Sequence, residues 1–267
     1  MINKAILKFE TKKNLLGAVI FSITWLALIA LFLMFFGTIK DSAEEFIEAY
    51  KNFEDIFIAF SGDINALMEI RGFYNVEIFS FLHLSMNIYA AYKGVSMIGK
   101  EITDKSLLFV LAKPISRLKI FTSKILAILL PLLLINIILC FGSALIIKLS
   151  TQEEVPLNYL INIYLGAFLL STVFANLGAL FGIILDESKA LGASIGVVVI
   201  SYILNLIGNL PNVTEILGKI SLHKYFDVFY VAQNNALKFP EIYVIMVSII
   251  ITFILGAISF KRKNIDI

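Results

Sequence analysis

The sequence is poor in charged residues and in cysteine. Asp, Glu, Lys and Arg make up only 16% of its 267 residues, while 59% are hydrophobic. An ordinary soluble domain is about 25% charged, so this composition excludes a soluble enzyme and a disordered protein. The single cysteine, Cys140, excludes an intrachain disulfide framework and a cysteine-based metal cluster. The net charge of +2 is too small for a surface that binds nucleic-acid phosphates.

Long uncharged runs are what the sequence has instead. A helix needs about 20 apolar residues to cross the ~30 Å hydrocarbon core of a bilayer. Six stretches fit this length, so we expect an all-α integral membrane protein with one transmembrane domain over residues 1–267. The second stretch is interrupted by His83 and Lys93. The expected spans lie near residues 15–39, 76–99, 119–148, 156–185, 190–210 and 241–260.

The basic residues indicate how the spans are oriented. Most of the 22 Lys and Arg residues fall in the segments that would share one side with the N-terminus, whereas the loop 38–77 is rich in Asp and Glu. Cytoplasmic loops of membrane proteins carry the excess of Lys and Arg. Both termini are therefore expected to be cytoplasmic. The basic segments are 1–14, 93–124, 186–189 and 261–267.

Two segments have an amphipathic pattern. Residues 1–14 mix apolar residues with lysines, which favours an interfacial helix on the inner leaflet over a frayed basic tail. In residues 40–75, aromatic residues recur at helical spacing, which predicts an outer amphipathic helix and a shorter one near residues 64–70. These outer helices could be a gate over a pathway, or they could rest on the bilayer surface or on the protein. The aromatic residues are Phe46, Tyr50, Phe53, Phe57 and Phe60.

The second outer segment, residues 209–241, contains Pro211, Gly218 and broken amphipathic stretches. It is expected to return to the membrane interface as short helices before the last span. His223 lies in this segment, but no second His, Cys or acid stands at metal-ligand spacing from it. A structural role is therefore favoured for His223, and no metal site is predicted.

The inner segment 93–124 carries the most specific pattern. Residues 101–112 are expected to form a helix that ends at Pro114, which lacks a backbone N–H. This helix is either part of an ordinary basic loop or a docking element for a cytoplasmic partner. The segment also holds a Gly-x-Glu, a Ser-Leu, a Pro-Ile-Ser-Arg and a later Lys. The residues of this pattern are Gly99, Glu101, Ser106, Leu107, Pro114, Ile115, Ser116, Arg117 and Lys124.

This pattern resembles that of the ABC-2 type transporter permeases, although Lys105 and Ser106 stand where the family usually has Gly and Thr. The resemblance implies that residues 100–118 are a coupling helix that contacts a separate ABC ATPase subunit. It implies that two six-span halves, identical or paralogous, form an export path in a bacterial cell membrane. ATP and Mg²⁺ would then be bound by the partner chain.

The sequence has no convincing nucleotide site or catalytic constellation of its own. Residues 94–100 match the first seven places of a phosphate-binding P-loop, but Glu101 replaces the required Ser or Thr. Ser80 and His83 would share one helix face, yet no oxyanion site accompanies them. We therefore expect a transport subunit without a cofactor in this chain, and neither an enzyme nor a nucleic-acid binder.

Polar and small residues inside the spans are expected to line a pathway or to join helices. His83 and Asn87 in the second span, and Trp25 in the middle of the first, are candidates for pathway lining. Small residues four apart let helices approach closely. Such pairs predict an antiparallel hairpin of the fourth and fifth spans; they are Gly178 with Gly182, and Gly192 with Gly196.

The sequence is compatible with three functions, which it favours to different degrees. The leading one is the membrane subunit of an ATP-driven exporter, with a hydrophobic or amphipathic cargo such as a drug or peptide. A secondary carrier or channel is disfavoured because no span has an acidic residue near its centre. An intramembrane enzyme is disfavoured by the missing catalytic groups. Binding of an ATPase separates the first function from the other two.

Overall fold

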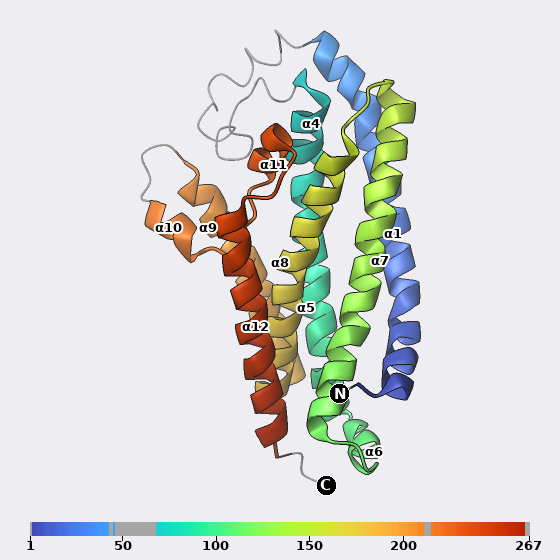
Figure 1. Cartoon of the computed structure of the whole chain (residues 1–267), viewed down its shortest axis with the longest axis vertical. Helices are drawn as coiled ribbons and strands as arrows, with labels where there is room; N and C mark the ends of the chain where they lie inside the picture. Colours follow the sequence, from blue (N-terminus) through green and yellow to red (C-terminus); the bar gives the residue numbers. More distant parts are fainter. Residues whose placement is uncertain (1, 43–44, 46–67, 211–214, 265–267) are drawn as a thin grey trace.

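A computed structural model describes residues 2–42, 45, 68–210 and 215–264, and within these ranges the chain consists of helices and their connections (Figure 1). The aromatic stripe predicted between residues 46 and 60 lies outside the described residues. The helices are α1 (Lys4–Asp41), α4 (Ile70–Phe73), the π-helix η3 (Tyr74–Phe79), α5 (Ser80–Thr103), α6 (Leu107–Leu111), α7 (Arg117–Thr151), α8 (Leu157–Ile184), α9 (Glu187–Gly208), α10 (Glu215–Ile220), the 3₁₀ turn η4 (His223–Tyr225), α11 (Val228–Asn234) and α12 (Phe239–Arg262).

Five described helices, α1, α7, α8, α9 and α12, are long and apolar enough to cross a membrane. They coincide with five of the six stretches expected from the sequence. The helix at the second stretch, α5, is not among the five, although it has 24 residues. Its His, Asn, Lys and Glu side chains lower its hydropathy. That α5 is a sixth span stays a prediction.

The helices form an elongated bundle in which α5 and α8 lie side by side, and α1 runs along α7 (Figure 1). In the most apolar part of α8, 67% of the residues are buried inside the chain, compared with 17–22% in α1, α9 and α12. Because α8 is covered by protein while α1, α9 and α12 expose apolar side chains, the latter three are suited to face lipid.

The N-terminal segment differs from the prediction. Residues 4–14 are not a separate interfacial helix but the first turns of α1, which continues unbroken to Asp41. The side chain of Asn3 caps this helix by accepting hydrogen bonds from the backbone N–H groups of Ala5 and Ile6. Gly17 lies just beyond residue 14, but an isolated glycine is tolerated inside a helix, and α1 runs through it.

The small-residue contact lies between α5 and α8. A Cβ atom added to Gly178 would be 2.2 Å from the carbonyl oxygen of Ala91, and one added to Gly99 would be 3.0 Å from the Cα of Gly182. The backbones of the two helices therefore approach more closely than any side chain would allow.

The predicted role of Gly192 and Gly196 was wrong. No atom lies within 4 Å of a Cβ added to either glycine, so they do not bring α9 against α8. The connection between α8 and α9 is short, as expected, but the partner of the α8 glycines is α5. The spacing of small residues identifies a helix face that can pack closely without identifying its partner.

The inner segment also differs from the prediction. The expected helix over residues 101–112 is divided: Glu101 belongs to the last turn of α5, and α6 has only five residues. Lys105 separates the two helices with a φ of 55°, a conformation that L-residues rarely adopt. Glycine, which the sequence lacks here, adopts it readily.

Candidate functional site

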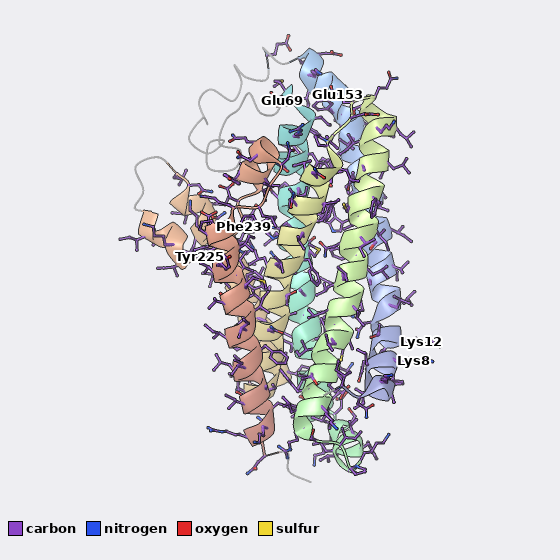
Figure 2. All side chains as sticks on the ribbon, in the orientation of Figure 1. Lys8, Lys12, Glu69, Glu153, Tyr225 and Phe239 are labelled. Carbon is purple, nitrogen blue, oxygen red and sulfur yellow. The ribbon has the colours of Figure 1, made fainter. Side chains whose placement is uncertain are left out.

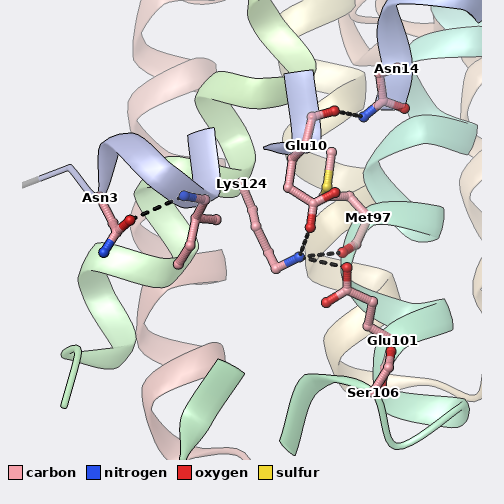
Figure 3. A network of polar contacts seen from close by, with 8 residues as sticks. Asn3, Glu10, Asn14, Met97, Glu101, Ser106 and Lys124 are labelled. Atoms are coloured by element: carbon pink, nitrogen blue, oxygen red, sulfur yellow. Dashed lines mark hydrogen bonds and ion pairs between the residues drawn. The ribbon is translucent and has the colours of Figure 1, made fainter. Parts of the chain in front are cut away.

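A fully buried lysine joins three helices at the end of the bundle where α1 and α7 begin and α12 ends (Figure 3). The Nζ atom of Lys124 on α7 lies 2.9 Å from Glu10 Oε1 on α1 and 2.7 Å from Glu101 Oε1 on α5. It also donates to the backbone oxygen of Met97, 3.3 Å away. We call Glu10, Glu101 and Lys124 the charge triad. It fixes the start of α1 and the end of α5 to α7.

A second contact holds α1 to α7 in the same region. The backbone N–H of Asn3 donates to Ser123 Oγ at 2.8 Å, and that hydroxyl donates to the carbonyl of Lys119. Ser123 is fully buried next to Lys124. The capped end of α1 is therefore attached to α7 at two neighbouring residues.

Arg117 binds the end of the last helix. Its Nη1 donates to the carbonyl oxygens of Phe260, Lys261 and Lys263, at 3.5, 3.2 and 2.6 Å. The last carbonyls of a helix lack partners within it, and a cation there also opposes the negative end of the helix dipole. Arg117, which the resemblance assigned to a partner contact, uses its guanidinium to join α7 to α12.

The short helix α6 is anchored on one side and exposed on the other. Leu107 is completely buried, whereas Phe109 is 80% exposed. Ile115 is half-buried against the core, and Pro114 and Ser106 are exposed. The buried Leu107 anchors α6 to the bundle, and the exposed face that carries Phe109 is accessible to a partner.

The length of α7 places this surface outside the hydrocarbon layer. The uncharged part of α7, residues 125–147, is about 34 Å long at the helical rise, which matches a hydrocarbon core of ~30 Å. Arg117 lies seven residues before Lys124, about 10 Å further along the axis. Figure 1 shows α6 beyond this end of α7, and Figure 2 shows Lys8 and Lys12 on the same half of the molecule, with Glu69 and Glu153 at the opposite end.

The predicted coupling residues thus divide into three groups. Ser106, Leu107, Pro114 and Ile115 belong to α6 and its flanking turns. Ser116 caps α7 by accepting from the N–H of Lys119. The others lie in helix contacts: Gly99 packs on α8, Arg117 binds the end of α12, and Glu101 and Lys124 form the charge triad.

A separate polar cluster lies in the half of the bundle nearer the opposite end. Asn87 Nδ2 is 3.1 Å from Nε2 of both His83 and His223, and Asn87 Oδ1 accepts from Ser171 Oγ at 2.7 Å. An amide nitrogen only donates, so both rings accept at Nε2 and carry their proton on Nδ1. The Nδ1–H of His223 then donates to Ser201 Oγ, 2.9 Å away.

This cluster joins the outer connection to the bundle. His223, Ser221 and Phe226, from the connection between α9 and α12, are all buried. Burial, together with the neighbouring ring of His83, lowers the pKa of His223 well below its ordinary value of 6.5. The structural role expected for His223 agrees with this geometry, whereas its contact with Asn87 was not foreseen. Within the described residues, no group of three or more His, Cys, Asp or Glu side chains could hold a metal ion.

The third candidate for pathway lining, Trp25, takes no part in this cluster. It is half-buried on α1 and packs against the hydrophobic core. His83 and Asn87 are buried in contacts between helices. Helix joining, the alternative that the sequence left open for these polar residues, describes their contacts in this structure.

The comparison with protein families decides the class. A family model described as "ABC-2 family transporter protein" matches residues 11–265. The chain belongs to the ABC-2 transporter family. A search of curated proteins gives no match. Together with the five apolar helices, membership in this family makes the chain a multi-pass membrane protein and the membrane component of an ABC transporter.

Proposed function

We propose that this ABC-2 family member is the permease subunit of an ATP-driven exporter in a bacterial cell membrane. A separate ATPase subunit binds and hydrolyses ATP with Mg²⁺, and two permease chains, identical or paralogous, form the translocation path. The observation that carries this proposal is the α6 surface, in a chain whose family membership is shown. Its exposed Phe109 lies beyond the apolar part of α7, on the side where the basic residues are concentrated.

The contacts around α6 support a mechanical role. The connection that contains α6 starts at the end of α5 and ends at the start of α7, and the charge triad ties these two ends together. Glu10 extends the same attachment to α1. A displacement of α6 by the ATPase would therefore move the inner ends of α1, α5 and α7 as one body. Rigid-body movement of packed elements is a common route by which ligand binding changes a distant site.

The cargo is proposed to be hydrophobic or amphipathic. The polar cluster inside the bundle consists of Asn and Ser side chains and two uncharged histidines. These groups join helices, and they add no charge to the bundle interior that would attract an ionic cargo. The one fully buried Lys is already paired with carboxylates at the inner end.

Site-directed cross-linking tests the docking surface. The only cysteine, Cys140, is buried in α7, so a Cys140→Ala background leaves no native thiol to compete. In that background, Phe109→Cys should cross-link to the ATPase subunit in native membranes with a short bifunctional amine–thiol reagent. Leu149→Cys is the matched control, because Leu149 is 73% exposed at the opposite end of α7.

Cross-linking of Phe109→Cys to a soluble ATPase, without a product from Leu149→Cys, would support the proposal. Equal labelling of both positions by lipid-soluble reagents, with no protein adduct at position 109, would contradict it. In that case a carrier or channel without an ATPase becomes the function to test.

A further inference from the structure

The charge triad contains one more acid than base. Glu10 is 5% exposed and Lys124 is not exposed at all. The side chain of Glu101 is 13% exposed. If both carboxylates were ionised, this nearly dry site would carry a net negative charge. Burying a charge without a partner costs several kcal/mol or more, and proteins usually avoid it by neutralising the group.

The hydrogen bonds show which atom lacks a partner. An ammonium group has three N–H donors, and those of Lys124 go to Glu10 Oε1, Glu101 Oε1 and the carbonyl of Met97. None remains for the second oxygen of Glu10. Glu10 Oε2 is buried and has no hydrogen-bond partner. A carboxylate oxygen in this position has no donor from the described part of the chain to stabilise its charge.

Among the residues that the structure describes, no second cation is paired with this site. The charged groups that face the site are Glu10 from α1, Glu101 from α5 and Lys124 from α7. Glu101 also lies in the last turn of α5, where the negative end of the helix dipole disfavours a carboxylate. The nearby lysines on the same three helices are exposed to their surroundings; they are Lys8, Lys12, Lys13, Lys100 and Lys119.

We propose that the charge triad is a proton-binding site, in which Glu10 and Glu101 share one proton at neutral pH while Lys124 remains charged. Two carboxylates close to one another cannot both ionise freely, so the proton belongs to the pair rather than to either residue. The site is then electrically neutral, with one ammonium, one carboxylate and one carboxylic acid. The ligand is a proton, which reaches the site from the cytoplasmic side through the partly exposed Glu101.

The proton has a consequence for movement, and this step rests on the proposed function. Glu10 and Glu101 are on different helices, so the proton is retained only while α1 and α5 stay together. Separation of these helices by a displacement of α6 would hydrate the carboxylates and release the proton. A change in helix position at this end would therefore be accompanied by proton release, and acidification would favour the closed arrangement.

Infrared spectroscopy of the purified chain tests the site without an ATPase. The carbonyl band of a protonated carboxylic acid is separate from the bands of a carboxylate. We expect this band in the wild-type protein at pH 7.5, and its loss in both Glu10→Gln and Glu101→Gln. Each variant leaves one carboxylate with Lys124, and that carboxylate ionises. Glu154→Gln, at an exposed ion pair, is the matched control and should keep the band.

Loss of the same band in both single variants is the signature of a shared proton. A band of unchanged intensity in both variants would overturn the proposal, because the two acids would then be ionised in the wild type. Neither outcome depends on a partner chain, so a negative result here would not contradict the proposed function. Likewise, failure of the cross-linking test would not contradict proton binding by the triad.

Unfolding in detergent gives a second readout if one variant folds poorly. Between roughly pH 5 and 7, the folded wild-type protein would hold one proton that the unfolded chain does not hold. Its unfolding constant should therefore rise about tenfold for each unit of increasing pH, compared with that of Glu10→Gln. A purely structural role for Glu10 would shift the stability of the variant by the same amount at every pH. Parallel curves for the two proteins would therefore contradict proton binding.

Discussion

The ammonium of Lys124 lies 2.7 Å from Glu101 Oε1, and this ion pair connects the two helices between which α6 is suspended. The pair crosses the base of the connection formed by residues 104–116. The ends of this connection are thus tied together, and within it α6 buries Leu107 and exposes Phe109.

Removing the lysine should be much more damaging than removing an acid. Lys124→Met leaves the two buried carboxyl groups of the triad without their cation, and loss of one partner from a buried ion pair costs roughly 3–5 kcal/mol. We expect a large fall in the unfolding midpoint in detergent and a reduced yield of monodisperse protein. The triple variant Glu10→Gln, Glu101→Gln, Lys124→Met should recover much of this loss, because no uncompensated charge remains.

Lys148→Met is the control for this experiment. Lys148 forms an ion pair with Glu154 at 2.8 Å, but both side chains are largely exposed. Its unfolding midpoint should stay close to that of the wild type, since exposed ion pairs contribute little to stability. Equal damage from Lys124→Met and Lys148→Met would show that burial of the triad has been misread.

The glycines of α8 and α9 should differ sharply in their tolerance of substitution. In Gly178→Leu, the new Cβ would collide with the carbonyl oxygen of Ala91, so α5 and α8 must separate. We expect this variant to lose most of its folded yield. Gly192→Leu has open space around the new side chain and should fold normally.

Size-exclusion profiles and thermal unfolding of the two variants measure this difference. Gly178→Ala serves as a milder probe and should lie between the wild type and Gly178→Leu. If Gly192→Leu proves as unstable as Gly178→Leu, the α5–α8 contact is not the close approach described above.

The histidine cluster predicts a loss of stability in acid. In the folded protein the pKa of His223 is well below 6.5 because the ring is buried, whereas in the unfolded chain it is ordinary. Below about pH 6.5 the unfolded state therefore binds more protons than the folded state. The unfolding constant then rises by up to tenfold for each unit by which the pH is lowered. Above that pH, this contribution no longer changes.

His223→Gln separates this titration from packing. The variant loses contacts at every pH, but its stability should depend less on pH below 6.5 than that of the wild type. Unfolding in detergent at several pH values between 5 and 7.5 gives the slopes. Identical slopes would mean that the ring is not held neutral by its hydrogen bonds to Asn87 and Ser201.

Arg117 is predicted to stabilise the end of α12 rather than to bind a partner directly. Arg117→Gln removes three hydrogen bonds to carbonyl oxygens at residues 260–263 and should cost roughly 1 kcal/mol of local stability. Amide hydrogen exchange near residues 258–263 should become faster while exchange in α5 and α8 is unchanged. Lys119→Gln, at an exposed position of the same helix, is the control, and faster exchange in that variant as well would argue against a specific cap.

Much of the fold follows from hydropathy alone. The runs that lie between Lys13 and Lys40, and between Lys124 and Lys148, are helices here because uncharged stretches of that length leave no other way to satisfy the backbone in a membrane. The third expected span, near residues 119–148, lies within α7, which Ser116 caps. The family resemblance rested on residues 99–124 and was confirmed over residues 11–265.

The partners of individual side chains could not be read from the sequence. Glu10 is the one acid among the lysines of residues 2–13, which was the available signal, yet its pairing with Lys124 depends on how α1 approaches α7. The contact of His223 with Asn87 likewise depends on how the outer connection folds back. Helix faces can be predicted from periodicity, but contacts between helices depend on packing across more than 100 residues of chain.

Whether this chain works with an ATPase can be tested by affinity purification of the tagged chain from its native membranes, followed by mass spectrometry. We expect recovery of a soluble ATPase with an intact P-loop, together with a second permease chain that is identical or similar. The yield of ATPase should fall in Phe109→Asp, while the yield of the permease itself stays unchanged. Gentle extraction that recovers the folded chain repeatedly without any ATPase would contradict the assignment of this protein as an ATP-driven permease.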